Sequence, residues 1–186
     1  MIFLEKEYEL KDGRICRLRS AEPEDAHNMI EYMKNVFSES HFLTRYPDEV
    51  FFSIEEERKI LIDCRDSANK LMVIGLLNDR VISQFNLRPV ADREKIRHRG
   101  AFGITVRKEL WGLGVGNIMM HEIIENSRKM KYEQLELDVY SDNENAVRLY
   151  EKYGFEIWGR IPDGYKLKDG TYRDCIKMGR KLEFII

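Results

Sequence analysis

The sequence predicts an α/β fold: a central, twisted, mixed and mostly antiparallel sheet of about seven strands, with helices on both faces. Two observations predict it. Segments that alternate apolar and polar residues, as strands do, recur along the chain and are separated by turn residues and by segments with apolar residues at helical spacing. In residues 100–140 a strand, a glycine-rich loop, a helix and a second strand follow one another. That order is typical of a right-handed crossover between parallel strands.

The composition is that of a folded domain. The chain has 186 residues, of which 43% are hydrophobic and 11% aromatic, and this content is typical of globular proteins. We therefore expect a single domain spanning residues 1–186. Basic and acidic side chains nearly balance, 31 against 33. This balance disfavours a nucleic-acid partner.

The spacing of cysteines and histidines indicates no metal site and no disulfide. Cys16, Cys64 and Cys175 are far apart, and the four histidines form no HxxH or HxxxH pair. The first residues turn acidic too early for a signal peptide, and no apolar run approaches the roughly 18 residues of a membrane span. We therefore expect a cytoplasmic protein with reduced thiols and no membrane partner.

The first elements follow from local turn and capping signals. Residues 3–19 alternate on both sides of an Asp-Gly turn and predict a hairpin. A helix is expected from Ser20 to about residue 35, with Pro23 in its first turn.

A second helix is expected over residues 54–66, because Ser53 suits its N-cap and Glu56 takes the capping-box position. Residues 71–77 and 81–87 then predict another hairpin.

The segment 38–49 between the first two helices has no regular period. It is either a plain surface loop or a flap that contacts a substrate, because variable loops often carry specificity. In a flap, its acidic side chains would meet an ammonium group and its aromatic side chains would form walls. The candidate substrate-binding residues are Glu39, Phe42, Tyr46 and Asp48.

The segment that most clearly indicates function lies past the middle of the chain. It predicts a strand at 100–106, a loop with Gly112, Gly114 and Gly116 at alternate positions, and a helix over about 115–130. Such a loop presents bare backbone N–H groups, and the positive end of the helix dipole points the same way. The arrangement is typical of a phosphate-binding site.

Several interpretations of this loop compete. A dinucleotide fingerprint needs a third glycine where the chain has Asn117, and a P-loop needs a Gly-Lys-Ser/Thr tripeptide, which does not occur. A turn without a ligand is the default for a lone Gly-x-Gly pair, although three spaced glycines at a helix start disfavour it. A pyrophosphate loop followed by a second strand and an asparagine-bearing helix continues to fit downstream.

The rest of the chain supplies that strand and that helix. Residues 134–140 alternate as a strand, Ser141-Asp142-Asn143 starts a short helix, and Gly154 ends it in the left-handed position. A strand at 155–159 and a hairpin between residues 165 and 182 complete the prediction.

Two segments resemble the GCN5-related N-acetyltransferase (GNAT) superfamily. The family's acetyl-CoA motif, Arg/Gln-x-x-Gly-x-Gly/Ala after a strand, is matched by Gly114 and Gly116, with Trp111 at the Arg/Gln position. The companion motif is Asn-x-x-Ala-x-x-Leu-Tyr-x-x-x-Gly-Phe. Here it is complete, as Asn143, Ala146, Leu149, Tyr150, Gly154 and Phe155.

The resemblance implies a GNAT fold and transfer of an acetyl group from acetyl-CoA, as co-substrate, to a primary amine by direct attack on the thioester. A small amine metabolite is the expected acceptor, and a protein or peptide N-terminus or a lysine is the alternative. A non-catalytic acyl-CoA-binding sensor is an alternative of another class, which the intact Tyr150 and Asn143 disfavour. Homodimers are common for such folds, so a homodimer is a possible assembly.

The resemblance also implies which residues contact the cofactor. The pyrophosphate would lie on the backbone amides from Gly112 to Asn117, and the pantetheine arm would pair with backbone near Ile104 to Val106. The implied cofactor-binding residues are Ile104, Thr105, Val106, Trp111, Gly112, Leu113, Gly114, Val115, Gly116, Asn117, Asn143, Ala146 and Tyr150.

Three residues are candidates for proton transfer. The departing thiolate needs a proton, which Tyr150 would supply, and the ammonium group of the acceptor must lose one before it attacks. A carboxylate acting through water is expected there. Asp138 is the first candidate, and Glu136, on the same strand face, is the second. Ordinary alternation in an amphipathic strand is the alternative explanation for both carboxylates.

Overall fold

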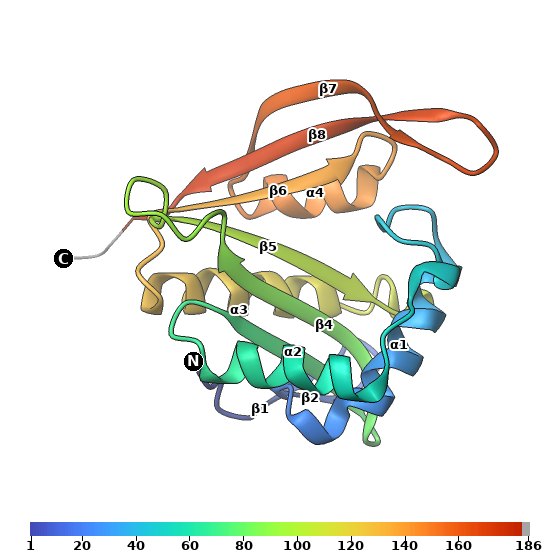
Figure 1. The fold of residues 1–186 in the computed structure, drawn as a ribbon, viewed down its shortest axis with the longest axis vertical. Coiled ribbons are helices and arrows are strands. Elements are labelled where there is room, and N and C mark those ends of the chain that lie inside the picture. Colours follow the sequence, from blue (N-terminus) through green and yellow to red (C-terminus); the bar gives the residue numbers. More distant parts are fainter. Residues whose placement is uncertain (184–186) are drawn as a thin grey trace. The chain divides into compact units, whose positions relative to one another are not determined.

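The computed structural model describes residues 1–183, which form a mixed α/β fold of four α-helices and one sheet of eight strands (Figure 1). The strands are β1 (Lys6–Glu9), β2 (Ile15–Ser20), β3 (Leu71–Leu77), β4 (Arg80–Pro89), β5 (Arg99–Val106), β6 (Gln134–Tyr140), β7 (Glu156–Lys166) and β8 (Tyr172–Lys181). The helices are α1 (Ala26–Glu39), α2 (Ile54–Asp66), α3 (Val115–Lys129) and α4 (Glu144–Lys152). The predicted fold class is confirmed, with one strand more than the expected number of about seven.

The strands lie in the order β1-β2-β3-β4-β5-β6-β8-β7. Each of the first four strands pairs antiparallel with the next: β1 with β2, β2 with β3, and β3 with β4. β8 pairs antiparallel with both β6 and β7. β5 and β6 pair in parallel, as predicted for the two strands that flank the glycine loop and α3.

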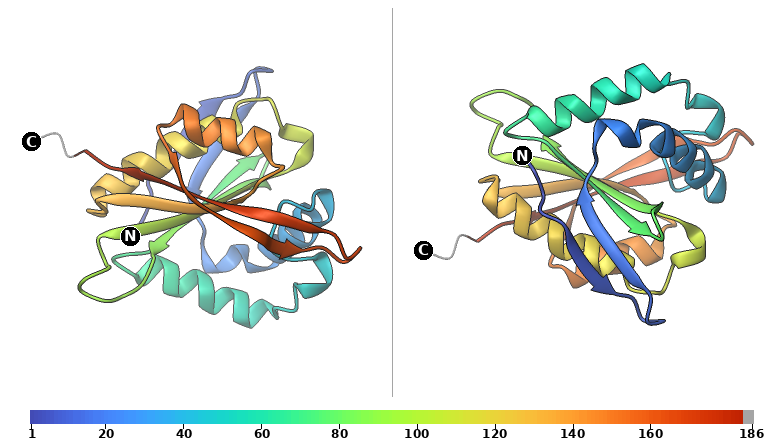
Figure 2. Two further views of the ribbon diagram at one scale, coloured as in Figure 1. Left: turned by 90° about the horizontal axis from the view of Figure 1, so that it is seen from above. Right: turned by 90° about the horizontal axis from the view of Figure 1, so that it is seen from below.

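The contacts within the chain group it into two compact units, and the first comprises Met1–Arg88 and Gly103–Met119. In this unit α1 and α2 lie on one face of β3 and β4 (Figure 2) and enclose a hydrophobic core. Its buried members are Ala21, Ala26, Met29, Tyr32, Val36, Leu61, Ile74, Leu76 and Val81.

The beginning of α3 covers the other face of β3. Ile74 and Leu76 belong to the core under α1 and α2, so Gly75 between them faces the opposite side of the strand. A Cβ atom at Gly75 would lie 3.2 Å from the methyl carbon of Met119. Helices on both faces of the sheet are therefore confirmed within this unit.

The capping predicted for α2 is confirmed. The Ser53 hydroxyl accepts a hydrogen bond from the Glu56 N–H at 3.2 Å, and the Glu56 carboxylate accepts one from the Ser53 N–H at 2.8 Å. This reciprocal pair satisfies two N–H groups at the helix start.

The predicted start of the first helix at Ser20 was wrong. Ser20 is the last residue of β2, and its hydroxyl accepts a hydrogen bond from the Phe3 N–H at 2.8 Å. A 3₁₀ turn, Pro23–Asp25, precedes α1, and the Asp25 carboxylate accepts hydrogen bonds from the Glu22 N–H and the Arg19 guanidinium. The chain therefore turns around Asp25 before the helix begins.

The second unit comprises Pro89–Phe102 and the chain from Met120 onward. Here β7 and β8 form a long hairpin, and β8 also pairs with β6 (Figure 1). The prediction of two separate strands at 155–159 and 165–167 was wrong, because β7 is one continuous strand with irregular register between Ile161 and Tyr165. β7 lies at the edge of the sheet, where Pro162, which has no N–H, is tolerated. The expectation of a single domain stays a prediction.

Within the described part of the chain, no helix has both the length and the apolar character needed to cross a bilayer.

Candidate functional site

The glycine loop joins β5 to α3 in the first unit. A 3₁₀ turn, Lys108–Leu110, follows β5, and α3 begins at Val115. Gly112 and Gly114 have φ angles of +81° and +97°. These angles lie in the left-handed region that glycine adopts without steric penalty. Space around the two residues is ample: nothing lies within 4 Å of a Cβ built at Gly112, and a Cβ at Gly114 would meet only the Lys11 side chain, at 3.9 Å. The backbone conformation, and not close packing, therefore requires glycine here.

Only some of the loop's backbone N–H groups can serve a ligand. Those of Trp111, Leu113 and Asn117 already donate to carbonyl oxygens of the same segment, at 3.0 to 3.3 Å. The first N–H groups of any α-helix have no partner inside the helix. Within residues 1–183, the donors that this leaves for an anion belong to Gly112, Gly114, Val115 and Gly116.

β5 extends beyond its pairing with β6. The parallel register joins Arg99 to Gln134, Gly100 to Leu135 and Ala101 to Glu136. Among the described residues it includes no later pair, although β5 continues to Val106. The predicted pantetheine-binding residues Ile104, Thr105 and Val106 are in this continuation, and all three are partly exposed.

Trp111, which stands at the motif's Arg/Gln position, is tied to the end of β5. Its indole Nε1 donates a hydrogen bond to the Val106 carbonyl at 3.0 Å, and 44% of the residue is exposed. The side chain thus closes the turn between β5 and the glycines while one part of its ring meets solvent. A cofactor contact by Trp111 stays a prediction.

Glu39, the last residue of α1, contacts the segment that follows β5. Its carboxylate accepts a hydrogen bond from the Lys108 N–H at 2.6 Å and lies 3.9 Å from the Arg107 guanidinium. A substrate ammonium group, predicted from the sequence to bind Glu39, would compete with both partners.

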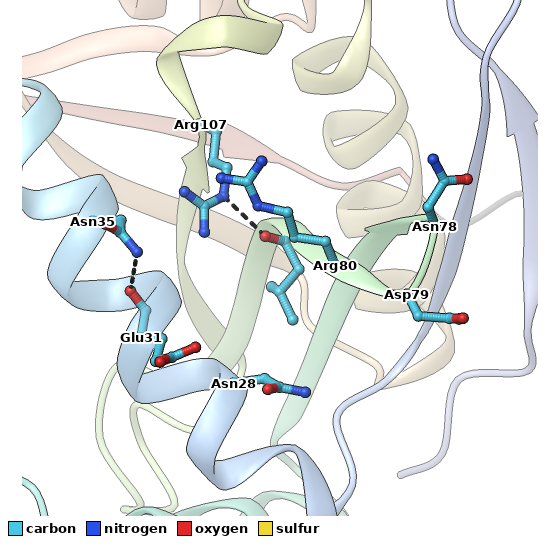
Figure 3. Close-up of a pocket in the computed structure, with 8 residues that line it drawn as sticks. Asn28, Glu31, Asn35, Asn78, Asp79, Arg80 and Arg107 are labelled. Atoms are coloured by element: carbon cyan, nitrogen blue, oxygen red, sulfur yellow. Dashed lines mark hydrogen bonds between the residues drawn. The ribbon is translucent and has the colours of Figure 1, made fainter.

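Arg107 is buried at the same place. Its Nε donates a hydrogen bond to the Val81 carbonyl at 3.0 Å (Figure 3), and its guanidinium lies 5.4 Å from the centre of the Tyr32 ring. The Tyr32 hydroxyl is hydrogen-bonded to the Thr105 hydroxyl at 2.8 Å, and burial raises the pKa of Tyr32 above its usual range. Sequence reasoning missed the contacts among these residues, because they belong to elements far apart in the chain.

A pocket of about 350 Å³ opens beside Arg107 (Figure 3). Acidic and basic side chains contribute equally to its lining, so its charge indicates no class of ligand. The lining residues are Asn28, Glu31, Asn35, Asn78, Asp79, Arg80, Val81 and Arg107.

Tyr150 lies on α4, in the second unit, among aromatic side chains. Its ring centre is 5.9 Å from that of Phe102, edge to face, and 6.1 Å from that of Phe155. Burial raises the pKa of Tyr150 to about 12. The phenol is therefore protonated at neutral pH and can donate its proton.

Two residues of the companion motif form the ends of α4. The Asn143 side-chain oxygen caps the helix by accepting a hydrogen bond from the Ala146 N–H at 3.3 Å, and Gly154 follows the helix with a φ of +74°. The predicted left-handed position of Gly154 is confirmed. The cap occupies the Asn143 oxygen, so the side-chain NH₂ group is the donor left for a ligand.

The two candidate carboxylates of β6 have different surroundings. Glu136 is buried and accepts hydrogen bonds from the Arg99 guanidinium, one of them at 2.8 Å, and from the Gln134 amide at 2.8 Å. Arg99 holds the pKa of Glu136 below its usual value, because the guanidinium stabilises the anion. Asp138 is exposed and lies 3.1 Å from the Lys177 ammonium group. Asp138 is thus the more accessible carboxylate, and the role of each stays a prediction.

The segment after α1 is partly ordered by its own contacts. Phe42 packs on His41 with ring centres 4.3 Å apart, and the Tyr46 N–H donates to the Glu49 carboxylate at 2.7 Å, at the start of a 3₁₀ turn, Pro47–Glu49. Phe42 and Tyr46 are partly exposed and Asp48 is exposed. Substrate contact by these residues stays a prediction.

Among the described residues, no group of three or more histidine, cysteine, aspartate or glutamate side chains is arranged to hold a metal ion.

The sequence is similar to those of known acetyltransferases. A family model described as the acetyltransferase (GNAT) family matches residues 29–155. The chain is 37% identical over 92 residues to the L-amino acid N-acetyltransferase AaaT of Escherichia coli, an alignment that covers 49% of this chain and 56% of AaaT. The chain thus spans about half the length of the curated relatives it matches.

Solved structures share the fold over most of the chain. An acetyltransferase of the GNAT family from Streptococcus pneumoniae has a TM-score of 0.85 and 29% identity, with 89% of this chain and 99% of that chain covered. A GNAT superfamily phosphinothricin acetyltransferase from Sinorhizobium meliloti, solved in complex with acetyl-CoA, has a TM-score of 0.77 and 18% identity, with 90% of this chain and 88% of that chain covered.

Proposed function

This chain belongs to the acetyltransferase (GNAT) family, and from that premise we propose that it transfers the acetyl group of acetyl-CoA to the primary amine of a small metabolite. The observation that carries the proposal is the glycine loop. Four of its N–H groups remain available for a ligand among the described residues, in the segment where the family's acetyl-CoA motif lies.

The cofactor contacts are proposed as follows. The N–H groups of Gly112, Gly114, Val115 and Gly116 bind the pyrophosphate, because N–H groups in and just before the first turn of a helix suit negative phosphate groups. Leu113 and Asn117 keep the loop in shape through their own hydrogen bonds.

The pantetheine arm pairs with the backbone of Ile104 to Val106, which continues beyond the β6 register. Asn143 and Ala146, at the start of α4, contact the arm near the thioester. The acetyl-CoA complex of the Sinorhizobium meliloti structure, which shares this fold, supports the choice of cofactor.

The proposed chemistry needs no covalent enzyme intermediate. The neutral amine attacks the thioester carbonyl, and the carbon–sulfur bond breaks as the amide forms. A backbone N–H near Val106 stabilises the oxyanion, and Tyr150 gives its proton to the departing thiolate. The nitrogen loses its extra proton to solvent as the amide forms, and Tyr150 regains one from solvent, so the protons balance. Asp138, which is exposed, removes the ammonium proton through water, in preference to Glu136, which is buried and held by Arg99.

The proposed acceptor is a small amine of the amino-acid class. The support is the partial similarity to a protein named L-amino acid N-acetyltransferase and to one named putative phosphinothricin acetyltransferase. Phe42, Tyr46 and Asp48 supply two aromatic surfaces and an acidic group for such a molecule. A peptide N-terminus or a lysine is the second candidate acceptor, and a homodimer remains a possible assembly.

Binding of acetyl-CoA should be measurable as thermal stabilisation. At 100 times its dissociation constant, acetyl-CoA should stabilise the protein by about 2.7 kcal/mol. The measurement is thermal unfolding with acetyl-CoA, with ATP at the same concentration as the control. Equal stabilisation by ATP, or none by acetyl-CoA, would contradict an acyl-CoA site.

A further inference from the structure

Residues 107–111, which we call the connecting segment, join β5 to the glycines of the loop. The first unit holds this segment at both ends. At the start, the Arg107 N–H donates to the Ile82 carbonyl at 3.0 Å and the Arg107 side chain donates to the Val81 carbonyl. At the end, Trp111 donates to the Val106 carbonyl. The course of the connecting segment is therefore set by contacts outside the glycine loop.

Glu39 provides the contact between these two ends. This residue, the last of α1, contacts the backbone of the connecting segment through the 2.6 Å hydrogen bond from the Lys108 N–H. A carboxylate that accepts a backbone N–H makes a charge-assisted bond, stronger than one between neutral groups. Arg107, 3.9 Å away and buried, adds a positive charge on the same side.

The position of Glu39 in its own helix is unfavourable. The C-terminal end of a helix carries a partial negative charge, which favours basic and disfavours acidic residues. The last turn of α1 contains no basic residue and ends with Glu39. The Glu39 carboxylate therefore does not stabilise its own helix. Its favourable contacts are those with Lys108 and Arg107, outside the helix.

We propose that Glu39 is a positioning residue that holds the connecting segment, so that the loop's N–H groups are arranged for pyrophosphate before acetyl-CoA binds. The inference rests on the proposed role of the loop. A loop fixed in advance loses less conformational freedom on binding, and this favours affinity. Glu39 thereby affects the affinity for acetyl-CoA, whereas the sequence alone suggested that Glu39 contacts the amine substrate.

The test compares Glu39→Ala, which removes the acceptor, with Glu39→Gln, which keeps an oxygen for the Lys108 N–H. Glu31→Ala is the matched control, because Glu31 lies on the same helix with an exposed side chain. Trp111→Phe removes the indole N–H from the other end of the segment and keeps an aromatic ring. Calorimetric titration gives the dissociation constant for acetyl-CoA. Hydrogen exchange of the Lys108 amide, measured without any ligand, reports on the hydrogen bond between Lys108 and Glu39.

Glu39→Ala should weaken acetyl-CoA binding about tenfold and speed exchange at Lys108, because the lost hydrogen bond involves a charged group. Trp111→Phe should weaken binding by a smaller factor. Glu39→Gln should stay within about threefold of the wild type, and Glu31→Ala should change neither quantity. The KM for the amine that reacts fastest in a panel of L-amino acids and diamines should be the same in Glu39→Ala as in the wild type.

Two results would overturn the proposal. One is a raised KM for the amine in Glu39→Ala with unchanged acetyl-CoA affinity, which would make Glu39 a substrate contact. The other is unchanged exchange at Lys108 in Glu39→Ala. A wild-type protein that does not bind acetyl-CoA would contradict the proposed function instead, and the exchange rates would still decide whether Glu39 holds the segment.

Discussion

Replacing Tyr150 with phenylalanine is expected to lower kcat for amine acetylation by a factor of about 10²–10⁴. The thiolate leaving group then departs without a positioned proton donor. The affinity for acetyl-CoA should stay nearly unchanged, because the substitution removes one oxygen and keeps the ring packed against Phe102 and Phe155. Steady-state kinetics and calorimetric titration of the two proteins separate the two effects.

The pH dependence of kcat gives a second check on Tyr150. Its pKa is raised to about 12 because burial disfavours the phenolate. The donor is therefore fully protonated below the ordinary tyrosine value of about 10 and loses its proton only as the pH rises through about 12. We expect no fall in the kcat of the wild type up to pH 10.

Tyr153→Phe is the matched control, since Tyr153 is the C-cap of the same helix. It should retain the turnover of the wild type. Full turnover in Tyr150→Phe, or a fall in kcat centred near pH 9 in the wild type, would remove Tyr150 as the proton donor.

Replacing Gly114 with valine is expected to weaken acetyl-CoA binding by a factor of about 10 to 100. A β-branched residue at a φ of +97° is strained, so the loop should relax to another backbone conformation. The N–H groups of the loop would then lose the arrangement that the positive φ angle gives them. Space is not the reason, because a Cβ at Gly114 would meet only the Lys11 side chain, at ordinary contact distance.

Gly170→Val is the control for backbone strain alone. Gly170 lies in the turn between β7 and β8 with a φ of +86°, and nothing lies within 4 Å of a Cβ built there. Both variants should lose stability, measured by thermal unfolding, but only Gly114→Val should lose acetyl-CoA affinity. Equal affinities in both variants would contradict the assignment of the loop to the pyrophosphate.

Elements fixed by nearby residues were predictable from the sequence. The Ser53–Glu56 capping pair marks the start of α2, and alternation alone placed β6 at 134–140. The start of α1 was missed because Ser20 is held by a hydrogen bond from Phe3, 17 residues away. The continuity of β7 was missed because a proline normally ends a strand. Pro162 is compatible with β7 because this strand lies at the edge of the sheet, which the sequence alone does not show.

The same distinction applies to the candidate site. The loop glycines and the ends of α4 depend on local backbone conformation, so the motifs located them. Glu39 meets Lys108 across 69 residues of sequence, and no local pattern shows that contact. Sequence reasoning therefore selected Glu39 by charge and could not identify its partner.

The most direct test of the central claim is release of free thiol from acetyl-CoA by the purified wild-type protein, followed with a panel of small amines, a peptide and no acceptor. We predict thiol release that depends on one class of small amine and matches, mole for mole, the acetylated amine found by mass spectrometry. Thiol release with the peptide and with none of the small amines would identify the second candidate, a peptide N-terminus or a lysine, as the acceptor. Binding of acetyl-CoA without thiol release on any acceptor would contradict the proposed enzyme and leave a protein that senses acyl-CoA.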